Sequence, residues 1–138
     1  MSTGQTKHSP SVLIADDDAL TRDALARTLR RAGLHVRTAS DGSDVEDDLE
    51  REPADILVLD LQMPGKNGFE VIRSLKSRYN PDIHNPRVAP KIIVVSGRDE
   101  PDTEQFARHL GADAYAVKPL LGQDLLALVR QFVGNRKL

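Results

Sequence analysis

Near the middle of the chain stands the segment Val58-Leu59-Asp60-Leu61-Gln62-Met63-Pro64-Gly65. It closes an apolar run that begins at Ile56, and it passes directly into Pro64 and Gly65, which favour a turn. A short apolar run ended by turn formers is typical of a strand buried on both faces of a sheet. Asp60 therefore places a carboxylate at the end of a buried strand, where a charge is costly unless a neighbouring group stabilises it.

The composition is that of one globular domain without a strong electrostatic field. The chain has 138 residues, of which 39% are hydrophobic and 29% are charged, as in an ordinary single domain. A formal net charge of −2 gives no reason to expect direct binding to nucleic acid or to a membrane surface. The absence of cysteine excludes disulfides and thiolate chemistry. No apolar run approaches the ~20 residues that a membrane helix needs.

The two ends of the chain are predicted to be tails. Residues 1–10 are polar and lack the apolar core of a signal peptide, so we expect a disordered tail on a cytoplasmic protein. The folded domain should span residues 11–134, followed by a C-terminal tail at 135–138. Because so few residues follow the last predicted helix, we expect a stand-alone domain whose output comes from its own surface.

Strand and helix patterns alternate five times along the chain. Each predicted strand is short and mostly apolar, and each is followed by a segment with helical spacing of apolar residues. This alternation indicates an α/β fold with a five-stranded parallel sheet and helices on both faces. The leucines expected to face the core are Leu20, Leu25 and Leu29 in the first helix and Leu121, Leu125 and Leu128 in the last.

Two segments have an unusual composition. The predicted helix at about 43–52 has Val45 and Leu49 as its core contacts and six acidic residues around them, which favours a solvated acidic face. Residues 79–90 contain three prolines and are predicted to form an extended surface loop. Since this loop leads into the start of a strand, we expect it at the edge of the sheet opposite the functional residues. It is either a contact surface or an inert insertion.

Polar residues that look misplaced all follow the ends of predicted strands, where parallel sheets bind their ligands. Three of them are carboxylates, and oxygen ligands without histidine or cysteine favour Mg²⁺, with Mn²⁺ or Ca²⁺ next. A lysine and a hydroxyl add groups suited to a phosphoryl oxygen. The sequence therefore predicts phosphoryl transfer to a carboxylate, and the residues alone leave open which carboxylate reacts. The set comprises Asp16, Asp17, Asp60, Ser96 and Lys118.

Four motifs in this order resemble the receiver domain of two-component response regulators, over about residues 11–134. They are Val12-Leu13-Ile14-Ala15-Asp16-Asp17-Asp18, Val58 to Gly68, Val94-Val95-Ser96-Gly97, and Gly111-Ala112-Asp113-Ala114-Tyr115-Ala116-Val117-Lys118-Pro119. The resemblance implies a flavodoxin-like doubly wound sheet with strand order 2-1-3-4-5. It also implies a cis peptide bond between Lys118 and Pro119.

The resemblance further implies the ligands of the metal and the group that reacts. Asp60 would be the phosphoacceptor and Asp17 a direct ligand of Mg²⁺. Asp16 would hold a water of the metal, and the backbone carbonyl of Gln62 would complete the protein ligands.

The remaining roles concern the response to phosphorylation. Ser96 would be the switch hydroxyl, Tyr115 the switch aromatic and Lys118 the partner of the phosphate. Gln62 and Arg98 lie two residues after Asp60 and Ser96, where the family tunes the lifetime of the phosphoryl group.

By this resemblance the protein would receive a phosphoryl group from a sensor histidine kinase or a histidine phosphotransfer protein and then change its affinity for a downstream protein. It would catalyse only its own phosphorylation and dephosphorylation, and whether it dimerises on phosphorylation is left open. One alternative is a haloacid-dehalogenase-type phosphohydrolase that uses Asp16 as nucleophile, which leaves Asp60 unexplained. The other alternative is an interaction module that works without phosphorylation.

Overall fold

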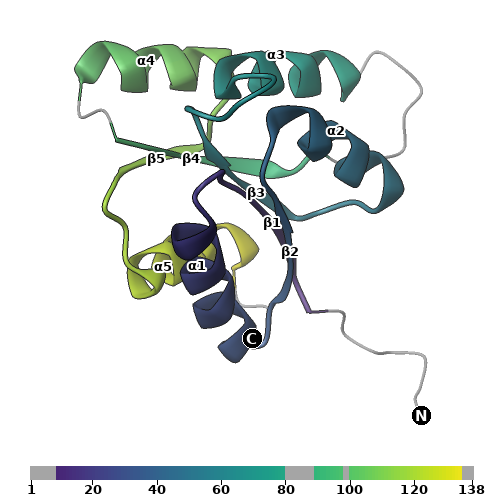
Figure 1. Ribbon diagram of the computed structural model, residues 1–138, viewed down its shortest axis with the longest axis vertical. Helices are drawn as coiled ribbons and strands as arrows, with labels where there is room; N and C mark the ends of the chain where they lie inside the picture. The colour runs from purple at the N-terminus through teal and green to yellow at the C-terminus, as the bar shows by residue number, and fades with distance from the viewer. Residues whose placement is uncertain (1–8, 80–88, 98–99, 135–138) are drawn as a thin grey trace.

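The computed structural model of the protein describes residues 9–79, 89–97 and 100–134. Within these residues five strands alternate with five helices (Figure 1). The strands form one sheet in the order β2-β1-β3-β4-β5, and every neighbouring pair is parallel, so the predicted topology is confirmed. The elements are β1 Ser11–Ala15, α1 Ala19–Arg31, β2 His35–Ala39, α2 Gly42–Arg51, β3 Ile56–Asp60, α3 Gly68–Arg78, β4 Lys91–Ser96, α4 Pro101–Leu110, β5 Ala114–Val117 and α5 Gly122–Val133.

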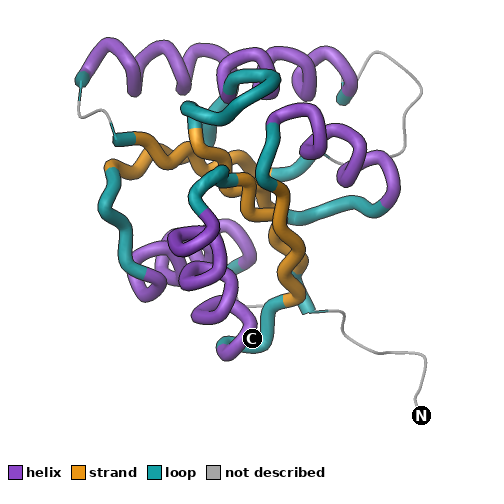
Figure 2. Tube along the Cα trace, in the orientation of Figure 1, coloured by secondary structure: helices purple, strands orange, loops and turns teal. Residues whose placement is uncertain are grey.

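The helices form two layers, one on each face of the sheet (Figures 1 and 2). Helices α1 and α5 lie together on one face, and α2, α3 and α4 cover the other. In β3, Ile56 and Val58 belong to the core under α1 and α5, whereas Leu57 and Leu59 belong to the core under the other three helices. All five residues of β3 are buried, because successive side chains of a strand point to opposite faces and both faces are covered.

Two leucines predicted to face the core are exposed instead. Leu20 is 83% exposed and Leu121 is 66% exposed, whereas Leu25 and Leu125 are buried as predicted. Leu20 lies in the first turn of α1, and Leu121 directly precedes α5. Both therefore stand where the chain has just left the carboxyl end of a strand, so little sheet surface is available to cover them.

The prediction of a solvated acidic face on α2 is wrong for part of the helix. Glu46 is only 9% exposed, and Asp48 forms an ion pair with Arg37 of β2 at 2.7 Å. These acids face basic groups of neighbouring elements, so packing against them replaces much of the water that the charge pattern alone suggested.

The predicted loop at 79–90 lies mostly outside the described residues, since 80–88 are not among them. Its first residue, Tyr79, follows α3 and packs against the core under α2, α3 and α4. Just beyond its last residue, Lys91 pairs with Ile56, the first residue of β3, and so lies at the sheet edge opposite Asp60.

No helix in the described part of the chain is both long and apolar enough to span a bilayer.

Candidate functional site

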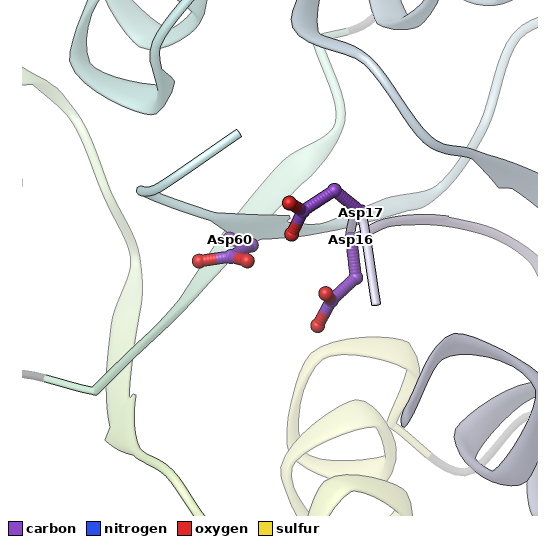
Figure 3. Close-up of side chains that lie close together, drawn as sticks. All are labelled: Asp16, Asp17 and Asp60. Atoms are coloured by element: carbon purple, nitrogen blue, oxygen red, sulfur yellow. The ribbon is translucent and has the colours of Figure 1, made fainter. Parts of the chain in front are cut away.

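Three carboxylates meet at the carboxyl edge of the sheet (Figure 3). Asp60 is the last residue of β3, and Asp16 and Asp17 follow the last residue of β1. Because β1 and β3 are parallel neighbours with Ala15 opposite Leu59, the three side chains come together. One oxygen from each of the three carboxylates lies within 4.8 Å of the others. The predicted convergence of these residues is therefore confirmed.

Hydrogen bonds from the following turns orient two of these carboxylates. The amide of Gln62 donates to Oδ1 of Asp60 over 3.0 Å, and the amide of Asp18 donates to Oδ1 of Asp16 over 2.9 Å. Asp16 and Asp60 are only 3% and 4% exposed, whereas Asp17 is exposed. In each buried carboxylate, one oxygen therefore accepts a hydrogen bond from a backbone amide, and the other faces Lys118.

Lys118 supplies the positive charge between the two buried carboxylates. Its Nζ lies 3.0 Å from Oδ2 of Asp16 and 3.2 Å from Oδ2 of Asp60. The backbone amide of Lys118 donates to the carbonyl of Ser96 over 2.7 Å, which continues the pairing of β4 with β5. The Lys118–Pro119 peptide bond is cis, as the resemblance implies.

Burial and these charges shift the pKa values of Asp60 and Lys118. Burial, reinforced by the charge of Asp16, raises the pKa of Asp60 above its usual range, although the Gln62 amide and Lys118 act in the opposite sense. Burial by itself lowers the pKa of Lys118, but the hydrogen bond to Asp16 and the charges of both carboxylates outweigh it and raise that pKa. The lysine is therefore held as an ammonium, and the two acids still repel each other.

The chemistry of the donor set fits a hard divalent cation. Asp16, Asp17 and Asp60 offer carboxylate oxygens only, and such oxygens are the protein ligands that Mg²⁺ prefers. Two of the three carboxylates are buried and repel each other, so a cation among them removes an electrostatic cost. The assignment of the Gln62 carbonyl as a further ligand stays a prediction.

Ser96 and Tyr115 lie on the side of the sheet that α2, α3 and α4 cover. Ser96 is fully buried at the end of β4 and lines a cavity of about 240 Å³ together with Phe69 and Thr103. Tyr115 is half-buried, stands opposite Val94 in the β4–β5 pairing, and packs against the core under α2, α3 and α4. Their roles as switch residues stay predictions, and Arg98 lies outside the described residues.

Two features of the site were not predicted from the sequence. The exposed side chains of Leu20 and Leu121 line a hollow of about 560 Å³ that also includes Lys118. In addition, Lys66, in the loop after β3, forms an ion pair with the buried Glu46 of α2. In the sequence, Glu46 is one of several acidic residues in the same segment. Nothing in that pattern indicates which of these acids is buried or which residue pairs with it.

Comparison with known proteins identifies the family. Residues 12–130 match the response regulator receiver domain. The chain is 34% identical over 120 residues to the sensory transduction protein RegX3 of Mycolicibacterium smegmatis, a match that covers 87% of this chain and 49% of the relative. It is 33% identical over 126 residues to the response regulator RR06 of Streptococcus pneumoniae, with 88% and 54% covered. The chain therefore belongs to the response regulator receiver domain family.

Solved structures agree with this assignment. The chemotaxis protein CheY4 of Vibrio cholerae superposes with a TM-score of 0.79 at 25% identity, covering 90% of this chain and 98% of that one. A CheY-like receiver domain protein of Methanospirillum hungatei gives a TM-score of 0.77 at 26% identity, covering 89% and 92%. The chain spans about half the length of the curated relatives named above. The acidic cluster of Asp16, Asp17 and Asp60 fits the phosphoacceptor site of such a domain.

Proposed function

We propose that this receiver domain accepts a phosphoryl group on Asp60 from a phosphohistidine of a histidine kinase or a phosphotransfer protein. The observation that carries this proposal is the placement of one buried carboxylate beside two other acids and one ammonium. Asp60 lies on the central strand of the sheet and reaches both the acidic pair after β1 and Lys118 after β5. Its place on the central strand, between the acids that follow β1 and the lysine that follows β5, favours Asp60 over Asp16 as the nucleophile.

The proposed reaction is an in-line displacement at phosphorus. An oxygen of the Asp60 carboxylate forms the new P–O bond while the P–N bond of the phosphohistidine breaks, and the electron pair leaves with the imidazole nitrogen. Lys118 faces the oxygens of the transferred group and disperses their charge. Asp17, Asp60 and the carbonyl of Gln62 would hold Mg²⁺ directly, and Asp16 would hold a water of the metal. When bound, the cation would supply positive charge that neutralises the acids of the site.

The proposed output is a change in the surface of α4, β5 and α5. Ser96 moves toward the phosphoryl group, and Tyr115 takes up the space that it leaves. The 240 Å³ cavity beside Ser96 supports this proposal, because it lies between the strand end and the first turns of α3 and α4. Hydrolysis of the aspartyl phosphate resets the domain, with Gln62 and Arg98 tuning its lifetime. The domain thus catalyses only its own phosphorylation and dephosphorylation.

The donor protein is proposed to dock on the exposed leucines beside the site. Leu20 and Leu121 flank the hollow that includes Lys118, so an apolar helix surface next to a phosphohistidine would bury both leucines while it presents phosphorus to Asp60. This placement explains why two large apolar side chains are left exposed at the functional edge.

The test is labelling by acetyl phosphate, followed as the mass increase of one phosphoryl group on the intact protein. The wild-type protein should be labelled with Mg²⁺ and not with excess EDTA, and Asp60→Asn should abolish labelling. Labelling that persists on another carboxylate in Asp60→Asn contradicts the proposal. Turnover of a small phosphoester that is lost in Asp16→Asn but kept in Asp60→Asn would instead support the phosphohydrolase alternative.

A further inference from the structure

The loop that follows Asp60 rests on the start of α2. We define the site loop as residues 61–67, which connect β3 to α3. The amide of Gly42, the first residue of α2, lies 3.5 Å from the carbonyl oxygen of Pro64. A Cβ at Gly42 would lie 1.8 Å from the carbonyl oxygen of Lys66, so the two backbones are in direct contact. The β2–α2 segment provides no side chain to the carboxylate cluster, yet it supports the loop beside it.

A partly buried ion pair connects the same two elements. Nζ of Lys66, in the site loop, donates a hydrogen bond to Oε2 of Glu46 on α2. The other oxygen of Glu46, Oε1, accepts from the hydroxyl of Ser74 over 2.6 Å and lies 3.4 Å from Arg78, both on α3. One carboxylate oxygen of Glu46 therefore holds the site loop, and the other holds α3.

The inner part of the site loop connects directly to the phosphorylation site. The amide of Gln62 donates to Oδ1 of Asp60 over 3.0 Å, and the amide of Gly68 donates to the carbonyl of Leu61 over 3.1 Å. The far end is closed by Asn67, whose side chain and that of Glu70 form a capping box at the start of α3. Lys66 thus anchors a short, hydrogen-bonded loop whose first residues contact Asp60.

We propose that Lys66, acting through Glu46, is a positioning residue for the cation site: it fixes the site loop so that the backbone at Gln62 is already in place when the cation binds. This inference rests on the proposed function of the cluster as a Mg²⁺ site and deepens it. Groups behind the direct ligands typically change metal affinity by about 10–100-fold when they are removed. The physical reason is that an unanchored loop must be ordered at the moment of binding, which costs conformational entropy.

The competing explanation is that Glu46 and its partners only stabilise the packing of α2 on α3. The chain offers a matched control, because Arg78 contacts Glu46 from the α3 side and does not belong to the site loop. Lys66 and Arg78 have similar exposure, with 31% and 32% of their side chains accessible. A purely structural role predicts that Lys66→Met and Arg78→Met have similar effects, whereas a positioning role separates them.

The experiment titrates wild type, Lys66→Met, Lys66→Arg and Arg78→Met with Mg²⁺ alone and follows the backbone amide signals of Asp16, Asp17 and Gln62 by NMR. Thermal unfolding of each metal-free protein measures stability in parallel. We expect Lys66→Met to bind Mg²⁺ about ten-fold more weakly than wild type. Arg78→Met should bind Mg²⁺ with nearly wild-type affinity. Lys66→Arg keeps the positive charge, so its affinity for Mg²⁺ should lie much closer to that of wild type than to that of Lys66→Met. In the metal-free proteins, the Gln62 amide should exchange with solvent faster in Lys66→Met alone.

Two results would overturn the inference. One is a Lys66→Met protein with wild-type affinity for Mg²⁺ and wild-type exchange at Gln62. The other is an equal loss of affinity in Lys66→Met and Arg78→Met that follows their loss of stability. If the wild-type protein itself binds no Mg²⁺, the proposed function fails. Exchange of the Gln62 amide in the metal-free proteins then still decides whether Lys66 holds the loop.

Discussion

Nζ of Lys118 lies 3.2 Å from Oδ2 of Asp60, and this contact joins the end of β5 to the end of β3 across β4. The same ammonium lies 3.0 Å from Oδ2 of Asp16, so one positive charge serves two buried carboxylates. One ammonium cannot neutralise both acids, and their mutual repulsion is in keeping with the raised pKa of Asp60, whose main cause is burial. The site therefore holds more negative charge than its protein partners compensate.

This excess charge predicts that Asp60→Asn stabilises the protein while it removes phosphorylation. A carboxyl whose pKa is raised in the folded state costs stability when it is ionised, and asparagine removes that charge at nearly constant volume. We expect the free energy of unfolding to rise by about 0.5–2 kcal/mol at neutral pH in metal-free buffer, measured by urea denaturation. Asp17→Asn is the control, because Asp17 is exposed and its replacement should change stability little. A less stable Asp60→Asn protein would contradict this account of the site.

The ionisation of Glu46, which lies outside the carboxylate cluster, should make the stability of the fold depend on pH. Burial raises the pKa of Glu46, but hydrogen bonds from Lys66 and Ser74 and the charges of Lys66 and Arg78 outweigh it, so the pKa lies below its usual 4.5. Because its pKa is lowered in the folded state, the ionised Glu46 carboxylate stabilises the fold above pH 4.5. This contribution to the free energy of unfolding is lost as the pH falls through the folded-state pKa. Glu46→Gln should therefore lose about 1.5–3 kcal/mol at neutral pH, with the difference from wild type shrinking in acid.

The measurement is urea denaturation of wild type and Glu46→Gln between neutral pH and the acid limit of folding. Glu50→Gln is a suitable control, because Glu50 also pairs with Arg78 but is exposed. A difference between wild type and Glu46→Gln that stays constant through the acid range would show that the charge of Glu46 is not what stabilises the fold.

Two of the leucines of α1, Leu20 and Leu25, predict losses of stability of very different size. Leu25 is 3% exposed and Leu20 is 83% exposed, so Leu25→Ala should cost about 2–5 kcal/mol and Leu20→Ala less than about 0.5 kcal/mol. Leu20→Ala should instead slow phosphotransfer from a phosphohistidine protein more than it slows labelling by acetyl phosphate, because the small donor has no helix to dock. Equal slowing with both donors would argue against the docking surface.

Gly42 predicts a steric effect at the contact between α2 and the site loop. A Cβ there would lie 1.8 Å from the carbonyl oxygen of Lys66, a backbone atom that cannot rotate away. Gly42→Ala should therefore destabilise the protein by about 1–3 kcal/mol, measured by thermal unfolding. Gly97→Ala is the matched control, because nothing lies within 4 Å of a Cβ at Gly97. Equal stability of the two variants would mean that the loop can shift away from α2.

The sheet and most of the site could be predicted because both follow from short-range patterns. Buried parallel strands are continuous apolar runs, so residue type alone predicts β3 and β4. The carboxyl ends of parallel strands also share one edge of the sheet. The positions of Asp16, Asp60 and Lys118 after three predicted strands therefore suffice to predict that they lie together. Strand order came from the resemblance to the family, because local patterns do not specify which strands pair.

The wrong predictions concern residues whose surroundings are made by distant segments. The spacing of Leu20 and Leu121 is that of core residues, and only the position of their helices relative to the sheet edge leaves them exposed. The composition of α2 predicts that Glu46 is one solvated acid among six, but its partners Lys66 and Arg78 lie 20 and 32 residues away along the chain. Long-range pairing of charges leaves no periodic signal, so composition alone assigns such an acid to solvent.

The alternation of β3 between two cores makes the strand intolerant of a change in its length. Ile56 and Val58 serve one core and Leu57 and Leu59 the other, and Asp60 follows in the same alternation. A deletion of one residue within β3 would turn every later side chain of the strand to the opposite layer. Asp60 would then point toward α3 and α4 and lose its contact with Lys118, although the composition of the strand would hardly change. Natural variation in length should therefore be confined to the connections, with β3 kept at constant length.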